Sequence, residues 1–130
     1  MFYIGPMKTL TLAFLLACSG AHAVNPALLP LDFDADGRYV KEVTVLPTKF
    51  IELCGKLQAG KRVVWRFDAT GPLNFNVHYH EGKSKVTYPA KVDGAMKAQA
   101  ALDVAVERDY CWMWTNQSAE PVVVTVELLR

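Results

Sequence analysis

The sequence has few cysteines and, after its first residues, no long apolar run. Only 3 of its 130 residues are cysteine, too few for a framework of several disulfides. After the amino-terminal segment, no apolar stretch approaches the roughly 20 residues that a membrane-spanning helix requires. We therefore expect no transmembrane segment in the folded part of the chain.

The sequence also lacks an excess of either charge and lacks the common catalytic motifs. It contains 14 basic and 13 acidic residues, and one of the basic residues, Lys8, lies in the amino-terminal segment. The near-neutral balance argues against a nucleic acid partner. Nucleophile elbows, phosphate-binding loops and zinc-protease motifs are absent. Carboxylates such as Asp68 and Glu81 fall on different predicted strands, so we expect that the protein is not an enzyme.

Residues 1–23 have the pattern of a secretory signal peptide. Lys8 gives a basic start, residues 9–17 form an apolar run, and Ala21-His22-Ala23 is a small-x-small cleavage site. An alternative is a bacterial lipoprotein signal, in which Cys18 would be lipidated; the alanine-rich cleavage site favours soluble export. The sequence therefore predicts a periplasmic or secreted protein.

Residues 24–37 read as an extended leader before the folded domain. Asp32, Asp34 and Asp36, followed by Gly37, match the first half of a calcium-binding loop. The position of the closing glutamate is occupied by Val43. We therefore interpret this stretch as a solvated acidic turn.

Residues 38–130 predict an all-β domain, a small antiparallel β-sandwich with a GOLD-like or jelly-roll-like arrangement of seven or eight strands. Turn signals recur about every 8 to 12 residues, and no helical period is sustained. Predicted strands cover residues 39–46, 50–57, 63–69, 73–80, 84–88, 110–116 and 122–129. The sequence predicts a turn at Thr70-Gly71-Pro72, a strand end at Pro89, and an exposed loop or edge strand over residues 90–103.

The strand at residues 73–80 carries the main candidate site. Strand alternation places Leu73, Phe75, Val77 and Tyr79 on one face and Asn74, Asn76, His78 and His80 on the other. The two imidazoles would lie roughly 7 Å apart, close enough to share a metal ion.

The predicted cofactor at this site is copper or zinc. Met113 or Cys111 would add a soft ligand, and Asn76 and Glu81 would form a second shell around the ligands. The alternative is that the histidines belong to an ordinary polar surface.

Cys54 and Cys111 are the two cysteines that would follow signal cleavage. In an exported domain they are expected to form a disulfide. The alternative is that Cys111 is a thiolate metal ligand. Beside it, Trp112 and Trp114 share a face with Tyr110, where they would form either a surface stacking platform or the aromatic core.

The chain resembles the Golgi-dynamics (GOLD) domain, a β-sandwich of secretory-pathway proteins. The resemblance rests on the segment Val64-Trp65-Arg66-Phe67, on Gly71 with Phe75-x-Val77, on Tyr110 with Trp114-x-Asn116, and on Val124-x-Val126-x-Leu128. It implies a domain that binds a protein or another ligand in the cell envelope without catalysis. The pair His78-x-His80 is not part of the family pattern.

Overall fold

A computed structural model describes residues 27–130, which fold into strands joined by turns and loops. The strands are β1 (Leu28–Pro30), β2 (Arg38–Val45), β3 (Phe50–Leu57), β4 (Arg62–Glu81), β5 (Lys85–Asp103), β6 (Arg108–Thr115) and β7 (Val122–Leu129). The prediction of an all-β fold is confirmed. The predicted signal peptide and Cys18 lie outside the described residues. No helix in the described part is long and apolar enough to span a membrane.

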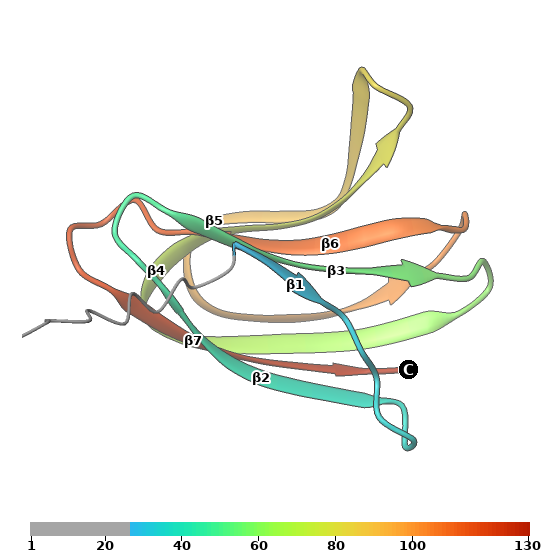
Figure 1. The fold of residues 1–130 in the computed structure, drawn as a ribbon, viewed down its shortest axis with the longest axis horizontal. Helices are drawn as coiled ribbons and strands as arrows, with labels where there is room; N and C mark the ends of the chain where they lie inside the picture. The colour runs from blue at the N-terminus through green and yellow to red at the C-terminus, as the bar shows by residue number, and fades with distance from the viewer. Residues whose placement is uncertain (1–26) are drawn as a thin grey trace, which may run out of the picture.

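The strands form one sheet that curls over on itself, in the order β1-β3-β6-β4-β7-β2, with β5 along the other edge of β4 (Figure 1). β4 makes this curl because it changes partner along its length. Residues Val64–Ala69 pair with β7, and residues Asn74–His78 pair with β6. The two halves of β4 therefore belong to two layers that face each other across the core.

The predicted turn at Thr70-Gly71-Pro72 is wrong. β4 runs without a break through these residues, although its register against β5 shifts between Asp68 and Leu73. The glycine and proline mark a bend at the change of partner rather than a chain reversal. The predicted strand end at Pro89 is also wrong, since β5 continues through it. An edge strand accepts proline because its outer side needs no hydrogen-bond donor.

The core lies between the two layers and is built mainly from alternate residues of β3, β4, β6 and β7. Trp65, Phe67, Phe75 and Trp114 form a cluster of rings, with centroids 4.8 to 5.9 Å apart in the contacting pairs. Trp112 and Trp114 are both buried, so neither forms a surface platform. The interpretation of these tryptophans as core residues is confirmed.

Two polar side chains hold the ends of the strands. Asn116 is fully buried; its Nδ2 donates to the carbonyl groups of Val45 and Glu120, and its Oδ1 accepts from Ser118. At the opposite end, Asp34 Oδ1 accepts from the backbone amides of Asp36 and Arg38. The aspartates of residues 32–36 thus form a turn, as expected from the incomplete calcium pattern.

A hairpin projects from the body of the domain where β4 meets β5 (Figure 1). Gly82 has a φ of 70° at its tip, a conformation that favours glycine. Glu81 stabilises the hairpin, because its carboxylate lies 3.0 Å from Lys85 Nζ and accepts a hydrogen bond from Thr87. These contacts lower the pKa of Glu81, with the interaction with Lys85 as the largest cause.

Candidate functional site

The outer surface of β3, β6 and the second half of β4 collects most of the predicted site residues. Residues paired across neighbouring strands point to the same face of a sheet. One row pairs Cys54 with Cys111 and Cys111 with His78, and the next pairs Glu52 with Met113 and Met113 with Asn76. We call the surface formed by these residues, with their neighbours Phe50 and His80, the histidine face.

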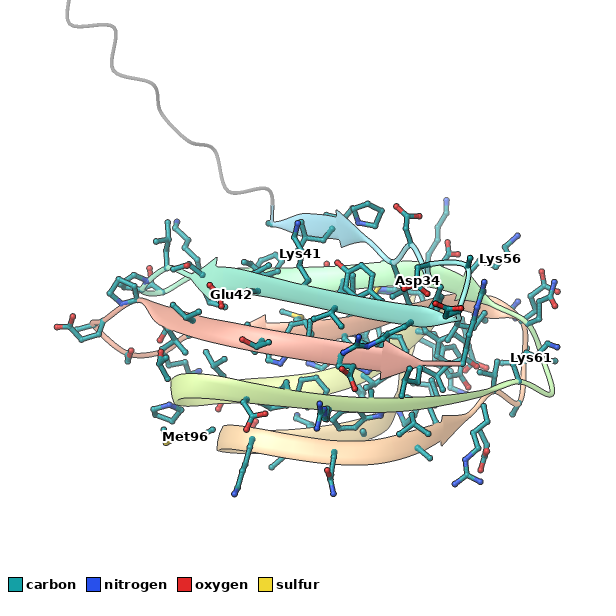
Figure 2. All side chains as sticks on the ribbon, turned by 90° about the horizontal axis from the view of Figure 1, so that it is seen from below. Asp34, Lys41, Glu42, Lys56, Lys61 and Met96 are labelled. Carbon is teal, nitrogen blue, oxygen red and sulfur yellow. A yellow bond between two sulfur atoms is a disulfide. The ribbon has the colours of Figure 1, made fainter. Side chains whose placement is uncertain are left out.

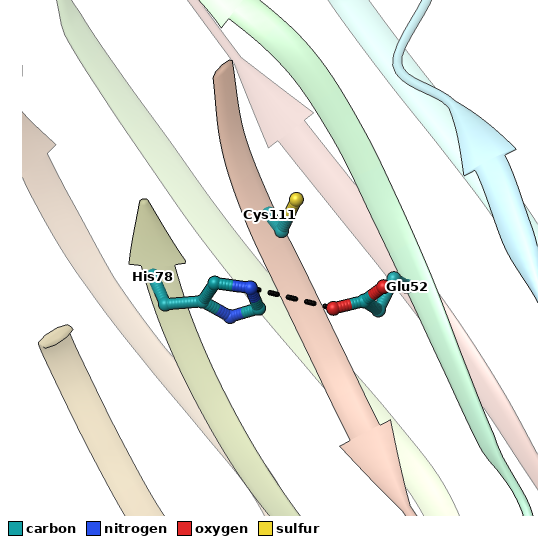
Figure 3. Close-up of side chains that lie close together, drawn as sticks. All are labelled: Glu52, His78 and Cys111. Carbon is teal, nitrogen blue, oxygen red and sulfur yellow. Dashed lines mark ion pairs between the residues drawn. The ribbon is translucent and has the colours of Figure 1, made fainter. Parts of the chain in front are cut away.

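His78 is the most enclosed polar group on the histidine face, with only 5% of its surface exposed. Its ring extends over β6 toward Glu52 on β3, beside the sulfur of Cys111 (Figure 3). Nδ1 lies 2.7 Å from Asn76 Oδ1, and Nε2 lies 3.3 Å from Glu52 Oε1. Both ring nitrogens therefore face an oxygen acceptor.

Burial lowers the pKa of His78, because an enclosed imidazole loses hydration when it takes a proton. The carboxylate of Glu52 opposes this shift, and the neighbouring His80 adds to it. The folded chain thus binds a proton at His78 less readily than the unfolded chain does.

Folding stability is therefore expected to depend on His78 in mildly acidic solution. The contribution of neutral His78 is complete above its ordinary pKa of 6.5, and it is lost as the pH falls below that value, because the unfolded state then binds more protons. We expect the free energy of unfolding to fall as the pH drops below 6.5, and to fall less in His78→Gln. Denaturant titrations at several pH values check this. An identical slope in both proteins would contradict it.

The predicted disulfide between Cys54 and Cys111 is confirmed. It joins directly paired residues of β3 and β6 on the histidine face. While the bond is intact, neither sulfur is a thiolate, so the alternative of Cys111 as a metal ligand does not hold in this state.

The structure brings the predicted metal ligands together only in part. The rings of His78 and His80 are 5.3 Å apart between centroids and nearly perpendicular. The register places Met113 on their face. Glu81 follows His80 on β4, so strand alternation turns it away from that face. Binding of copper or zinc by His78, His80 and Met113 stays a prediction.

Among the described residues, one group of potential metal ligands converges: Glu52, His78 and Cys111 have donor atoms within 4.8 Å of one another. Sequence reasoning missed Glu52. The available signal was its spacing of two residues from Cys54, which places both on one face of a strand.

Exposed apolar side chains surround the buried part of the histidine face. Leu28, Phe50 and Tyr88 are 61%, 43% and 51% exposed. Tyr88 also contacts His78, with ring centroids 5.9 Å apart. A shallow pocket of about 450 Å³ opens here, lined by Leu28, Glu52, Cys54, His80, Arg108, Asp109 and Cys111. Exposed aromatic groups are typical of protein-binding surfaces.

The opposite outer surface, on β2, β7 and the first half of β4, is different in character. Its centre is an ion-pair network in which Glu127 lies 2.6 Å from Arg38 and 3.4 Å from Arg66. The charged side chain of Glu42 also lies on this face of β2 (Figure 2), two residues along the strand from Val40. Its exposed apolar residues are the aliphatic Val40, Val64 and Leu129. This surface is suited to solvent contact.

Comparison with solved structures identifies proteins of the same fold. The Aeromonas hydrophila protein PliG, a periplasmic lysozyme inhibitor of g-type lysozyme, is 17% identical, with a TM-score of 0.56 over 79% of this chain and 95% of that chain. Salmonella Typhimurium PliG, also a periplasmic inhibitor of g-type lysozyme, is 8% identical, with a TM-score of 0.52 over 80% of this chain and 97% of that chain. These likenesses show a shared fold.

No protein-family model matches the chain, nor does any curated protein sequence. The resemblance to the GOLD domain therefore stays a prediction.

Proposed function

We propose that this chain is an exported protein-binding domain of the lysozyme-inhibitor type, acting in the periplasm or outside the cell. The fold is that of two inhibitors of g-type lysozyme. The amino-terminal sequence has the pattern of an export signal. A non-catalytic, protein-binding role fits a chain without recognisable catalytic motifs.

The proposed binding surface is the histidine face together with the projecting β4–β5 hairpin. The observation that carries this assignment is the exposure of the aromatic side chains of Phe50 and Tyr88, with that of Leu28, which lines the shallow pocket. Buried aromatic anchors supply much of the energy of protein association. Enclosed His78 and the disulfide give these anchors a rigid base, which reduces the entropy lost on binding.

The first partner to test is a g-type lysozyme. We expect the purified exported protein to inhibit cell-wall hydrolysis by the lysozyme and to bind it in calorimetry. Phe50→Ala and Tyr88→Ala should each weaken binding by roughly tenfold, the loss typical of an aromatic anchor. Val64→Ala is the matched control, because Val64 lies on the opposite outer surface; it should change affinity by less than about twofold.

Two results would contradict parts of this proposal. Absence of both inhibition and binding would reject g-type lysozyme as the partner. Binding that is weakened by Val64→Ala but not by Phe50→Ala or Tyr88→Ala would place the interface on the opposite surface. Circular dichroism of each variant should match the unaltered protein, because all three side chains are exposed.

A further inference from the structure

His78 and Glu52 are arranged as two ligands of one cation. The 2.7 Å contact between His78 Nδ1 and Asn76 Oδ1 is a hydrogen bond in the tautomer that carries the ring proton on Nδ1. The other nitrogen, Nε2, faces Glu52 Oε1 at 3.3 Å. In the neutral ring Nε2 then has a free lone pair, so Nε2 and the Glu52 carboxylate are placed to bind one metal ion together.

The spacing of these two atoms suits a tetrahedral metal. For zinc bonds of about 2.0 to 2.1 Å, tetrahedral geometry separates a nitrogen and an oxygen ligand by about 3.3 Å. The distance from Nε2 to Oε1 is 3.3 Å. Asn76 supplies the outer contact that metal-binding histidines commonly have, since an acceptor on Nδ1 fixes Nε2 as the ligand.

Opening the disulfide would free a sulfur atom that lies beside this pair. The sulfur of Cys111 lies within 4.8 Å of both the His78 and the Glu52 donor atoms. A tetrahedral zinc site separates sulfur and nitrogen ligands by about 3.6 Å, so a shift of about 1 Å closes the gap. Cys54 is bonded to Cys111, and both line the shallow pocket that gives access from solvent.

We propose that reduction of the disulfide creates a zinc site whose ligands are Cys54, Cys111, His78 and Glu52. The reductant is a dithiol: its two thiols become a disulfide, and its two electrons and two protons convert Cys54 and Cys111 to thiols. Zinc then replaces the two thiol protons, which pass to solvent, and two zinc–sulfur bonds form. The oxidised chain offers only His78 and Glu52 from this set and binds zinc weakly. The site is independent of any protein partner.

The test uses the full exported chain, reduced with a dithiol that is then removed without oxygen. Zn²⁺ affinity is measured by competition with a chelating dye, and Co²⁺ serves as a spectroscopic probe. We expect one Zn²⁺ per reduced chain and a thiolate-to-cobalt charge-transfer band that is absent from the oxidised chain. His78→Gln and Glu52→Gln should each weaken Zn²⁺ binding at least tenfold. The matched control His80→Gln should change it less than twofold.

Several outcomes would overturn the proposal. The reduced chain could show no thiolate–cobalt band, or it could bind Zn²⁺ equally well with and without His78 and Glu52, which would mean that the thiols act alone. If reduction unfolds the chain, Zn²⁺ must restore the β-sheet circular dichroism signal; a chain that stays unfolded with Zn²⁺ contradicts the site. Glu52→Gln keeps the test valid if His78→Gln does not fold, because the Glu52 side chain is partly exposed.

Discussion

Phe75→Ala is expected to lower the free energy of unfolding by about 4 kcal/mol, within the range for truncating a buried aromatic side chain. Phe75 is 1% exposed and lies at the centre of the ring cluster. Its centroid is 4.9 Å from that of Trp65, 4.8 Å from Phe67 and 5.5 Å from Trp114. The variant loses the burial of the ring and leaves a cavity among large, rigid neighbours that cannot collapse into it.

The position of Phe75 in the curled sheet increases this effect. It lies on the half of β4 that pairs with β6, whereas Trp65 and Phe67 lie on the half that pairs with β7. Phe75 therefore packs the two halves of one strand against each other. Without its ring, the bend in β4 loses its main apolar support.

Guanidinium titrations of the oxidised protein at neutral pH measure this loss as a shift of the midpoint at constant slope. Phe50→Ala is the matched control, since Phe50 is 43% exposed; it should cost less than about 1 kcal/mol. Equal losses at both positions would show that the ring cluster does not hold the layers together.

The sequence predicts the faces of the strands more reliably than their connections. Alternation over residues 73–80 correctly assigns Leu73, Phe75 and Val77 to the core, because side-chain direction in a strand is a local property. The sequence predicts a turn at Gly71, where the structure has a bend, because glycine and proline accompany both features. Only the pairing of β4 with β6 and β7 distinguishes a bend from a turn here, and these strands are distant from β4 in the sequence.

The candidate site shows the same limit. The shared face of Asn76, His78 and His80 follows from one strand, and the link between Cys54 and Cys111 follows from the export signal. The role of Glu52 depends on β6 lying between β3 and β4, which no local pattern reveals. The burial of His78 also depends on this order, because its ring lies across β6.

Removal of the disulfide is expected to lower the free energy of unfolding by about 4 kcal/mol. The cysteines are 57 residues apart in the sequence, and opening a loop of this length frees the unfolded chain by about that amount in the chain-entropy model. Total stabilities of single domains are about 5 to 15 kcal/mol, so the change is a large share. The double variant Cys54→Ala/Cys111→Ala measures this loss. Alanine is preferred to serine, because serine would leave a buried hydroxyl group at Cys111, which is 8% exposed.

Zinc distinguishes the two roles of these cysteines, as a cross-link in the oxidised protein and as metal ligands in the reduced protein. The double alanine variant and the reduced, zinc-free protein should both be less stable than the oxidised protein by similar amounts, because both lack the cross-link. Zn²⁺ should recover part of the stability of the reduced protein, since binding to the folded state alone stabilises it. It should leave the stability of the double alanine variant unchanged.

Equal stabilities for the oxidised protein and the double alanine variant would contradict the cross-link prediction. Zn²⁺ that stabilised the double alanine variant as much as the reduced protein would instead show that its ligands do not include the two sulfur atoms.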